Sequence, residues 1–165
     1  MATTSLRGTP VHTVGDLPVV GDQVPAYTLT GGDLTEVSSD SFSGSRVVLN
    51  VFPSLDTATC AASVRRFNEL ASSLANTVVV CASADLPFAM RRFCGVEGLD
   101  AVVTGSAFRS SFGTDLGVTM VDGPMRGLLA RAVVVVDTEG SVLHAELVPS
   151  IGSEPDYDAA VAALG

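Results

Sequence analysis

The fold is decided by residues 46–82, which read RVVLNVFPSLDTATCAASVRRFNELASSLANTVVVCA. Its first part, Arg46 to Phe52, is a compact apolar run rich in β-branched residues, which predicts a buried strand that ends at Pro53. The apolar residues then recur at spacings of three and four, which predicts a helix from about Thr59 to Leu74. Thr77 to Ala82 predicts a second buried strand. Together they form a βαβ unit, so the two strands should be parallel.

Further elements are expected on both sides of this unit. Asp85 is expected to cap a helix that opens at Leu86-Pro87 and ends near Cys94-Gly95. Turn signals across residues 8–30 predict an N-terminal β-hairpin. The remaining predicted elements are a short strand at Ala101–Thr104, a helical turn at Ser110–Leu116, a hairpin of strands Arg131–Asp137 and Val142–Val148, and a terminal helix at Pro155–Leu164.

In this order, the elements predict an α/β protein with a thioredoxin-like fold, in which helices flank a mixed central sheet and a β-hairpin extends the N-terminus. The chain has 165 residues, of which 47% are hydrophobic, so it is long and apolar enough for a sizeable core. No internal repeat or linker divides it. We therefore expect a single domain over residues 1–165.

The charge of the chain excludes several classes of function. The formal net charge is −9 and the sequence pI is near 4.4, so the surface should repel nucleic acids. All nine basic residues are arginines, which rules out Schiff-base chemistry and a P-loop lysine. The N-terminus has no apolar stretch typical of a secretory signal, and no apolar run is long enough to span a bilayer. We expect a cytoplasmic protein that binds neither nucleic acid nor membrane.

Three cysteines indicate thiol chemistry rather than a disulfide framework or a metal site. A secreted disulfide framework would favour an even and denser set, and neither a Cys-x-x-Cys pair nor zinc-ligand spacing occurs. Cys81 continues an apolar run and should face the core. His12 and His144 lie far from every cysteine in the sequence and are expected to be ordinary surface or packed residues.

Cys60 is the main candidate for a reactive residue. It lies where a buried strand gives way to a helix, and free backbone N–H groups and the helix dipole favour a thiolate there. Thr57 can place a hydroxyl beside the sulfur, and Pro53 can exclude solvent and fix the loop. A buried cysteine that only packs at a helix start is the alternative, and the nearby threonine and proline favour a positioned nucleophile.

At this point the sequence resembles a known family. The segment PSLDTATC, preceded by NVF and followed by AASVRRFNEL, is similar to the bacterial thiol peroxidases of the Tpx type, which are atypical two-cysteine peroxiredoxins. Further similar blocks are VGDQVPAYTL, SADLPFAMRRFCG, DGPMRGLLARAVVVVD and SEPDYDAAVAAL. The resemblance covers nearly the whole chain in order, and the blocks together are highly specific.

The resemblance implies a catalytic set. Pro53, Thr57 and Cys60 match the family's proline, threonine and peroxidatic cysteine, Cys94 matches its resolving cysteine, and Arg131 matches its active-site arginine. Arginine suits this role because it is permanently charged and offers several donors in a fixed fork. Without the resemblance, a solvated charge at a strand end would be the favoured interpretation of Arg131, and Cys94 could be a packed thiol near a helix end.

The implied activity is the reduction of hydrogen peroxide and alkyl hydroperoxides. Cys60 would become a sulfenic acid, an intramolecular Cys60–Cys94 disulfide would follow, and a thioredoxin-like protein would reduce it. The resemblance also implies a homodimer and no metal or organic cofactor. An apolar collar could favour organic peroxides, or the same residues could belong to the core or a dimer interface: Phe88, Phe93, Met120 and Met125.

Two other functions stay open from the residues. A peroxide-sensing or thiol–disulfide exchange module could use the same fold, although the missing Cys-x-x-Cys speaks against disulfide exchange. A cysteine hydrolase would need a general base, normally histidine, within reach of the thiol. The position of the two histidines relative to Cys60 therefore separates the hydrolase from the peroxidase.

Overall fold

The computed structural model describes all residues from 1 to 165. A seven-stranded sheet forms the centre of the molecule, in the spatial order β4-β3-β7-β6-β5-β8-β9. Its strands are β3 (Thr28–Thr30), β4 (Glu36–Ser38), β5 (Arg46–Val51), β6 (Thr77–Ser83), β7 (Val103–Ser106), β8 (Ala132–Val136) and β9 (Val142–Leu147). The sheet is mixed, because β5, β6 and β7 run parallel while β3, β4, β8 and β9 join by antiparallel pairing. The predicted parallel βαβ unit is confirmed.

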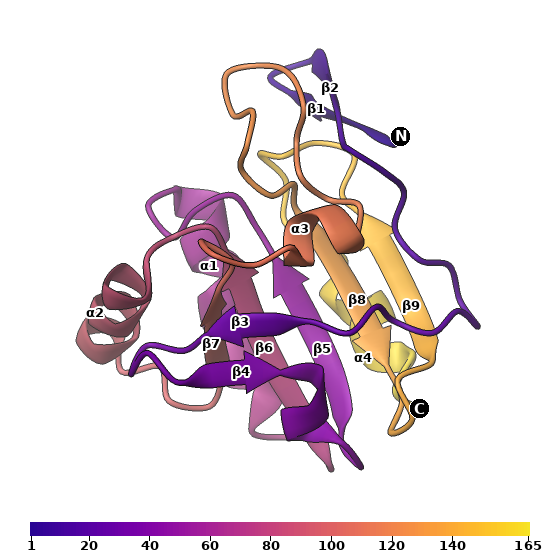
Figure 1. The fold of residues 1–165 in the computed structure, drawn as a ribbon. Coiled ribbons are helices and arrows are strands. Elements are labelled where there is room, and N and C mark those ends of the chain that lie inside the picture. Colours follow the sequence, from indigo (N-terminus) through magenta and orange to yellow (C-terminus); the bar gives the residue numbers. More distant parts are fainter.

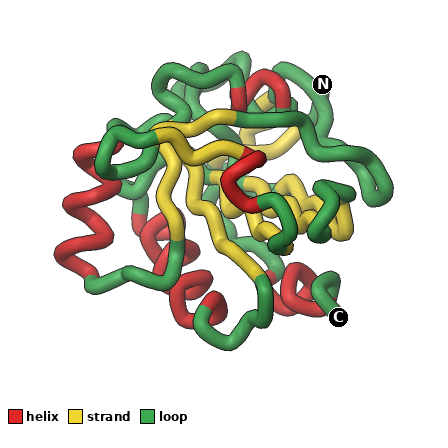
Figure 2. The backbone as a smooth tube through the Cα atoms, turned by 60° about the horizontal axis from the view of Figure 1, so that its bottom comes forward, coloured by secondary structure: helices red, strands yellow, loops and turns green.

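Helices lie on both faces of the sheet (Figures 1 and 2). They are α1 (Ala58–Ala71), α2 (Pro87–Glu97), α3 (Phe112–Asp115) and α4 (Tyr157–Ala162), with a 3-10 turn η1 at Ser39–Phe42. Alternate residues of β5 point into two cores, as period-two strands require. Val47 and Leu49 join the core that contains Phe112 of α3, whereas Val48 joins the core with residues of α1, α2 and α4. The thioredoxin-like architecture predicted from the sequence is confirmed.

The N-terminal hairpin exists, but it lies earlier than predicted. Strands β1 (Thr3–Leu6) and β2 (Thr9–His12) form a separate two-stranded sheet, joined by Arg7 and Gly8. Most of residues 13–27 is irregular chain that connects this hairpin to β3. The turn signals in residues 8–30 therefore marked bends of an extended connection rather than one hairpin. Figure 1 shows the hairpin at the top of the molecule, beside the loop that precedes β8.

Two predictions about α2 are wrong. The first is the cap, because Leu86 occupies the N-cap position of α2 and makes no side-chain cap bond. Asp85 accepts hydrogen bonds from the loop after β5 instead. The second is the end, because the helix continues to Glu97 and Gly98 terminates it in the left-handed conformation. Gly95 is tolerated within the helix, and the left-handed backbone at Gly98 is the stronger stop signal.

Candidate active site

Cys60 lies in the first turn of α1, where Thr57 caps the helix. The Thr57 hydroxyl accepts the Cys60 backbone N–H at 3.3 Å and donates to the Ser54 carbonyl at 3.2 Å. The neighbouring Asp56 is exposed and does not cap the helix. Cys60 itself is fully buried. The cap holds the loop and the first turn of α1 in one arrangement. The Thr57 hydroxyl proton is used by the Ser54 carbonyl, so Thr57 can donate to a bound oxygen only after its hydroxyl turns away from Ser54.

Arg131 reaches Cys60 across the sheet. It directly precedes β8, and the antiparallel register pairs Ala132 with Val51, so Arg131 lies beside the end of β5. Its Nη2 donates to the Cys60 sulfur at 3.2 Å, and its Nε donates to the Ile151 carbonyl at 3.0 Å. Two residues 71 positions apart in the sequence therefore meet at one point.

Positive charge is concentrated at the Cys60 sulfur. Arg131 is only 1% exposed and has no carboxylate partner. A buried guanidinium without an anion is costly, and Cys60 is the group within hydrogen-bond reach that can carry a negative charge. The N-terminus of α1 favours the same charge. Nη1 of Arg131 is buried with no partner in the protein, so it is free to donate to an oxygen of a substrate.

The loop that carries the predicted Pro53 and Thr57 is tied to the neighbouring strand by Asp85. Pro53 is buried. The Asp85 carboxylate accepts from the Ser54 hydroxyl at 2.7 Å and from the Leu55 N–H at 2.8 Å. Asp85 thus supports the loop in front of Cys60. No local sequence signal indicates this role, because the partners are 30 and 31 residues away.

Cys94 lies on α2, apart from the Cys60–Arg131 pair, and all three thiols are unpaired. The Cys94 side chain is partly buried, and burial raises the pKa of its thiol. Cys81 is fully buried in β6, and burial raises the pKa of its thiol to about 12. In this conformation neither group is a competing thiolate near neutral pH. The predicted core position of Cys81 is confirmed.

A surface hollow of about 430 Å³ opens beside Cys60. Thr57 and Arg131 line it together with Leu6 and Arg7 of the N-terminal hairpin. The rest of its wall is formed by Thr59, Met125, Ser150, Ile151, Gly152 and Ser153. None of these residues is acidic, although acidic residues outnumber basic ones by 18 to 9 in the chain. The hairpin residues in this wall were not predicted.

The predicted apolar collar is not one structure. Met125 lines the hollow beside Cys60, whereas Met120 is buried in a small core under the hairpin. Phe93 borders a different hollow, with Leu55 and Val96, and Phe88 is 64% exposed. Only Met125 of the four thus belongs to the wall of the site.

The histidines are not placed for thiol catalysis. His12 bonds to Asp122, and His144 lies on β9 with its Nε2 buried and unpartnered. Neither donates to nor accepts from Cys60. No group of three His, Cys, Asp or Glu side chains is arranged to hold a metal ion, and no helix is long and apolar enough to cross a membrane.

Comparison with known proteins agrees with this geometry. Residues 19–161 match the family model described as Redoxin. The thiol peroxidase of Mycobacterium tuberculosis H37Rv is 59% identical over all 165 residues, which is 99% of that relative. The chain belongs to the thiol peroxidase branch of the redoxin family. The thiol peroxidase of Corynebacterium glutamicum is 54% identical over 99% of both chains.

Solved structures place the fold in the same family. A peroxiredoxin-like protein from Aquifex aeolicus superposes with a TM-score of 0.94 at 36% identity, covering 99% of this chain and 96% of the other. The Redoxin match starts at residue 19, so the β1–β2 hairpin lies outside it. The two thiol peroxidases align over the hairpin as well. The hairpin segment therefore lies outside the matched Redoxin region but inside the sequence alignment with both thiol peroxidases.

Proposed function

We propose that this thiol peroxidase relative reduces hydroperoxides, with Cys60 as the attacking residue. The observation that carries this proposal is the buried Arg131, which pairs with no carboxylate and donates from Nη2 to the Cys60 sulfur at 3.2 Å. An arginine held in this way stabilises a thiolate and still has Nη1 free for a peroxide oxygen. The names of the relatives support the same activity.

The chemistry balances without a cofactor. The Cys60 thiolate attacks the terminal oxygen of R–O–O–H, the O–O bond breaks, and RO⁻ leaves and takes a proton to become an alcohol, or water when R is hydrogen. Cys60 is then a sulfenic acid. Arg131 and the N-terminus of α1 stabilise the charge that moves from sulfur to the leaving oxygen. Thr57 and Pro53 act by holding the loop in place.

Turnover requires a second thiol, for which we propose Cys94. It would condense with the sulfenic acid to form the Cys60–Cys94 disulfide and release water. Cys60 is fully buried within α1 and Cys94 is partly buried within α2, and we propose that local opening of at least one helix brings the two sulfurs together. A thioredoxin-like dithiol protein would then reduce the disulfide by exchange.

The setting of the reaction is also part of the proposal. Three unpaired thiols suit a reducing compartment, which supports the cytoplasm.

We propose a homodimer from the family resemblance, and analytical ultracentrifugation would test it. A dimer fraction below one half at micromolar concentration would contradict it.

The test is peroxide consumption in the presence of thioredoxin and its reductase. We expect turnover by the wild type and none by Cys60→Ser. Cys94→Ser should consume about one equivalent of peroxide and then stop. Cys81→Ser is the matched control and should turn over normally. Full turnover by Cys60→Ser would sink the proposal, and a stable sulfenic acid without turnover in the wild type would favour a peroxide sensor.

A further inference from the structure

The hollow beside Cys60 is far larger than hydrogen peroxide needs. Its volume of about 430 Å³ lies in the range of about 300–1,000 Å³ that is typical of sites for small organic ligands. It adjoins a second hollow of about 480 Å³, which shares Leu6, Arg7 and Met125 with it. The second hollow is lined further by Thr9, Val11, Gly123, Pro124 and no charged residue. A molecule with an apolar body can therefore extend from Thr57 and Arg131, which contact Cys60, across the tip of the hairpin.

Arg7 stands where the two hollows meet, and its charge has no partner. It is exposed, it belongs to none of the ion pairs of the structure, and it donates no hydrogen bond to another residue. No acidic side chain lines either hollow. Because the protein as a whole carries a net charge of −9, this rim is a local exception that favours an anion.

The backbone at Arg7 gives independent support. Arg7 has a φ of +51° and Gly8 a φ of +83°, so the two residues form a hairpin turn with positive φ at both central positions. Such turns strongly prefer asparagine or glycine at the first position, and a long side chain there is unfavourable. The turn therefore does not explain why an arginine is present.

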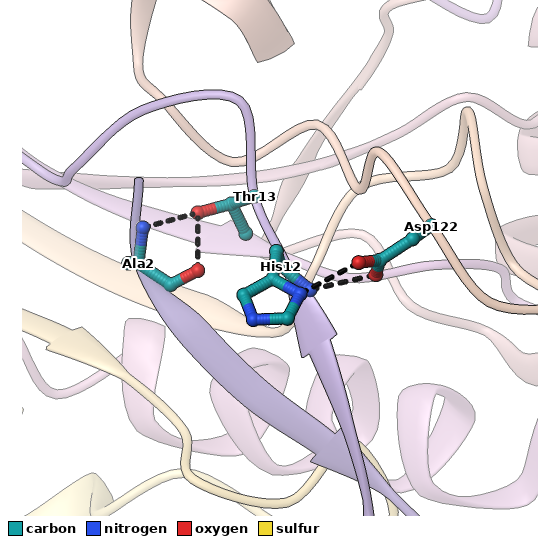
Figure 3. Close-up of polar contacts among 4 residues, drawn as sticks. All are labelled: Ala2, His12, Thr13 and Asp122. Carbon is teal, nitrogen blue, oxygen red and sulfur yellow. Dashed lines mark hydrogen bonds and ion pairs between the residues drawn. The ribbon is translucent and has the colours of Figure 1, made fainter.

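The hairpin is held rigidly against the rest of the site. Figure 3 shows His12 bonded to Asp122 through its backbone N–H at 2.8 Å and its ring Nδ1 at 2.6 Å, and Ala2 bonded to Thr13. Asp122 belongs to the same loop as Met125. On the other side of the hairpin, the Ser5 carbonyl accepts the N–H of Ile151, whose own carbonyl holds Arg131. These bonds anchor the hairpin on both sides of the Arg7 backbone, next to the loops that contact the reactive pair.

We propose that Arg7 binds the carboxylate of an organic hydroperoxide with an apolar chain, so that the free acid is preferred over its ester. This inference rests on the proposed peroxidase function. The hydroperoxide group lies at Cys60 and Arg131, the chain lies along Leu6 and Met125, and the carboxylate pairs with Arg7. A free carboxylate and a guanidinium form the charge-assisted, forked contact that arginine favours.

The test compares a fatty acid hydroperoxide with its methyl ester, both below their critical micelle concentrations, and hydrogen peroxide as reference. The variant is Arg7→Asn, because asparagine suits the positive φ and keeps the hairpin. We expect kcat/KM for the acid to fall about five- to tenfold while the ester and hydrogen peroxide are unchanged. Arg7→Lys should recover part of the loss.

Arg126→Gln is the matched control, because Arg126 is an exposed arginine next to Met125 that lines neither hollow. An equal loss in Arg126→Gln would show general attraction of anions and overturn the proposal, as would an unchanged ratio of acid to ester in Arg7→Asn. Calorimetry with the fatty acid lacking the peroxide separates this inference from the function. Binding that weakens five- to tenfold in Arg7→Asn supports the carboxylate site even if no peroxide is consumed, and equal affinities overturn it.

Discussion

The surroundings of Cys60 and Cys94 differ in almost every respect. Cys60 is fully buried, lies in a helix capped by Thr57, and faces a buried arginine. Cys94 is partly buried on a helix whose N-terminus has no side-chain cap. A bidentate ion pair between Arg65 and Glu97, with both distances at 2.9 Å, links the middle of α1 to the C-terminal end of α2.

This difference separates two physical tasks. Attack on a peroxide needs fixed charges around the sulfur, because preorganised electrostatics lower the barrier. Resolution needs the fully buried Cys60 sulfur to meet a thiol on another helix, and we propose that local opening of α2 allows this. The first region should therefore respond to loss of charge or of the cap, and the second to changes that loosen α2.

The largest effect is expected from Arg131. In Arg131→Met, the rate of Cys60 oxidation by hydrogen peroxide should fall by about 10²–10³, because the buried donor to the sulfur and the peroxide is lost. Single-turnover mass spectrometry measures this rate. Removal of a buried charge need not destabilise the protein, so the thermal midpoint should confirm folding. Arg126→Met is the control for overall charge, and a fall of less than threefold in Arg131→Met would contradict the assigned role.

Removal of the Thr57 cap should have a smaller effect on the same region. Thr57→Val removes the acceptor for the Cys60 N–H and should cost about 1 kcal/mol of stability. We expect a fall of about tenfold in Cys60 oxidation, because the sulfur loses its fixed position. Thr57→Ser keeps the hydroxyl and should retain most of the stability and most of the rate of Cys60 oxidation. Equal behaviour of the valine and serine variants would rule out the cap as the cause.

The two regions also differ in how well the sequence predicts them. Cys60 was predictable because one local signal, a buried strand followed by a helix, indicates both the fold and the position of a reactive cysteine. Arg131 needed the family resemblance, because only the β5–β8 register brings it to the sulfur. Asp85 was assigned as a cap, since its true partners, Ser54 and Leu55, are distant in sequence. Arg7 was not predicted at all, because the hairpin was placed too late in the chain.

A smaller effect, in the opposite direction, is expected from Glu97. Glu97→Gln weakens the only ion pair that links α1 to α2, so α2 should open more readily and the Cys60–Cys94 disulfide should form about two- to threefold faster. Quenched-flow alkylation and mass spectrometry follow this step. Glu69→Gln is the control, because Glu69 pairs with Arg66 inside α1 and joins no second helix. Slower resolution in Glu97→Gln would mean that the ion pair positions Cys94 rather than restrains it.

The smallest effect is a dependence of the same ion pair on pH. Hydrogen bonds from Arg65 hold the pKa of Glu97 below its ordinary value of 4.5. Because the folded pKa is lowered, the stabilisation by this carboxylate is complete above pH 4.5 and is lost as the pH falls through the folded value. At pH 7 the thermal midpoint of the wild type should therefore exceed that of Glu97→Gln by about 1 °C, and this difference should disappear in acid.

The quantity to measure is the difference in thermal midpoint between the wild type and Glu97→Gln, because other groups titrate in the same pH range. Hydrogen bonds from His12 also lower the pKa of Asp122, and this pair ties down the hairpin in both proteins. Its contribution cancels in the difference, and only the Arg65–Glu97 contact remains. High salt at pH 7 should narrow the same gap, since both partners are substantially exposed. A gap that persists in acid and in salt would assign the effect to packing of α2 instead of charge.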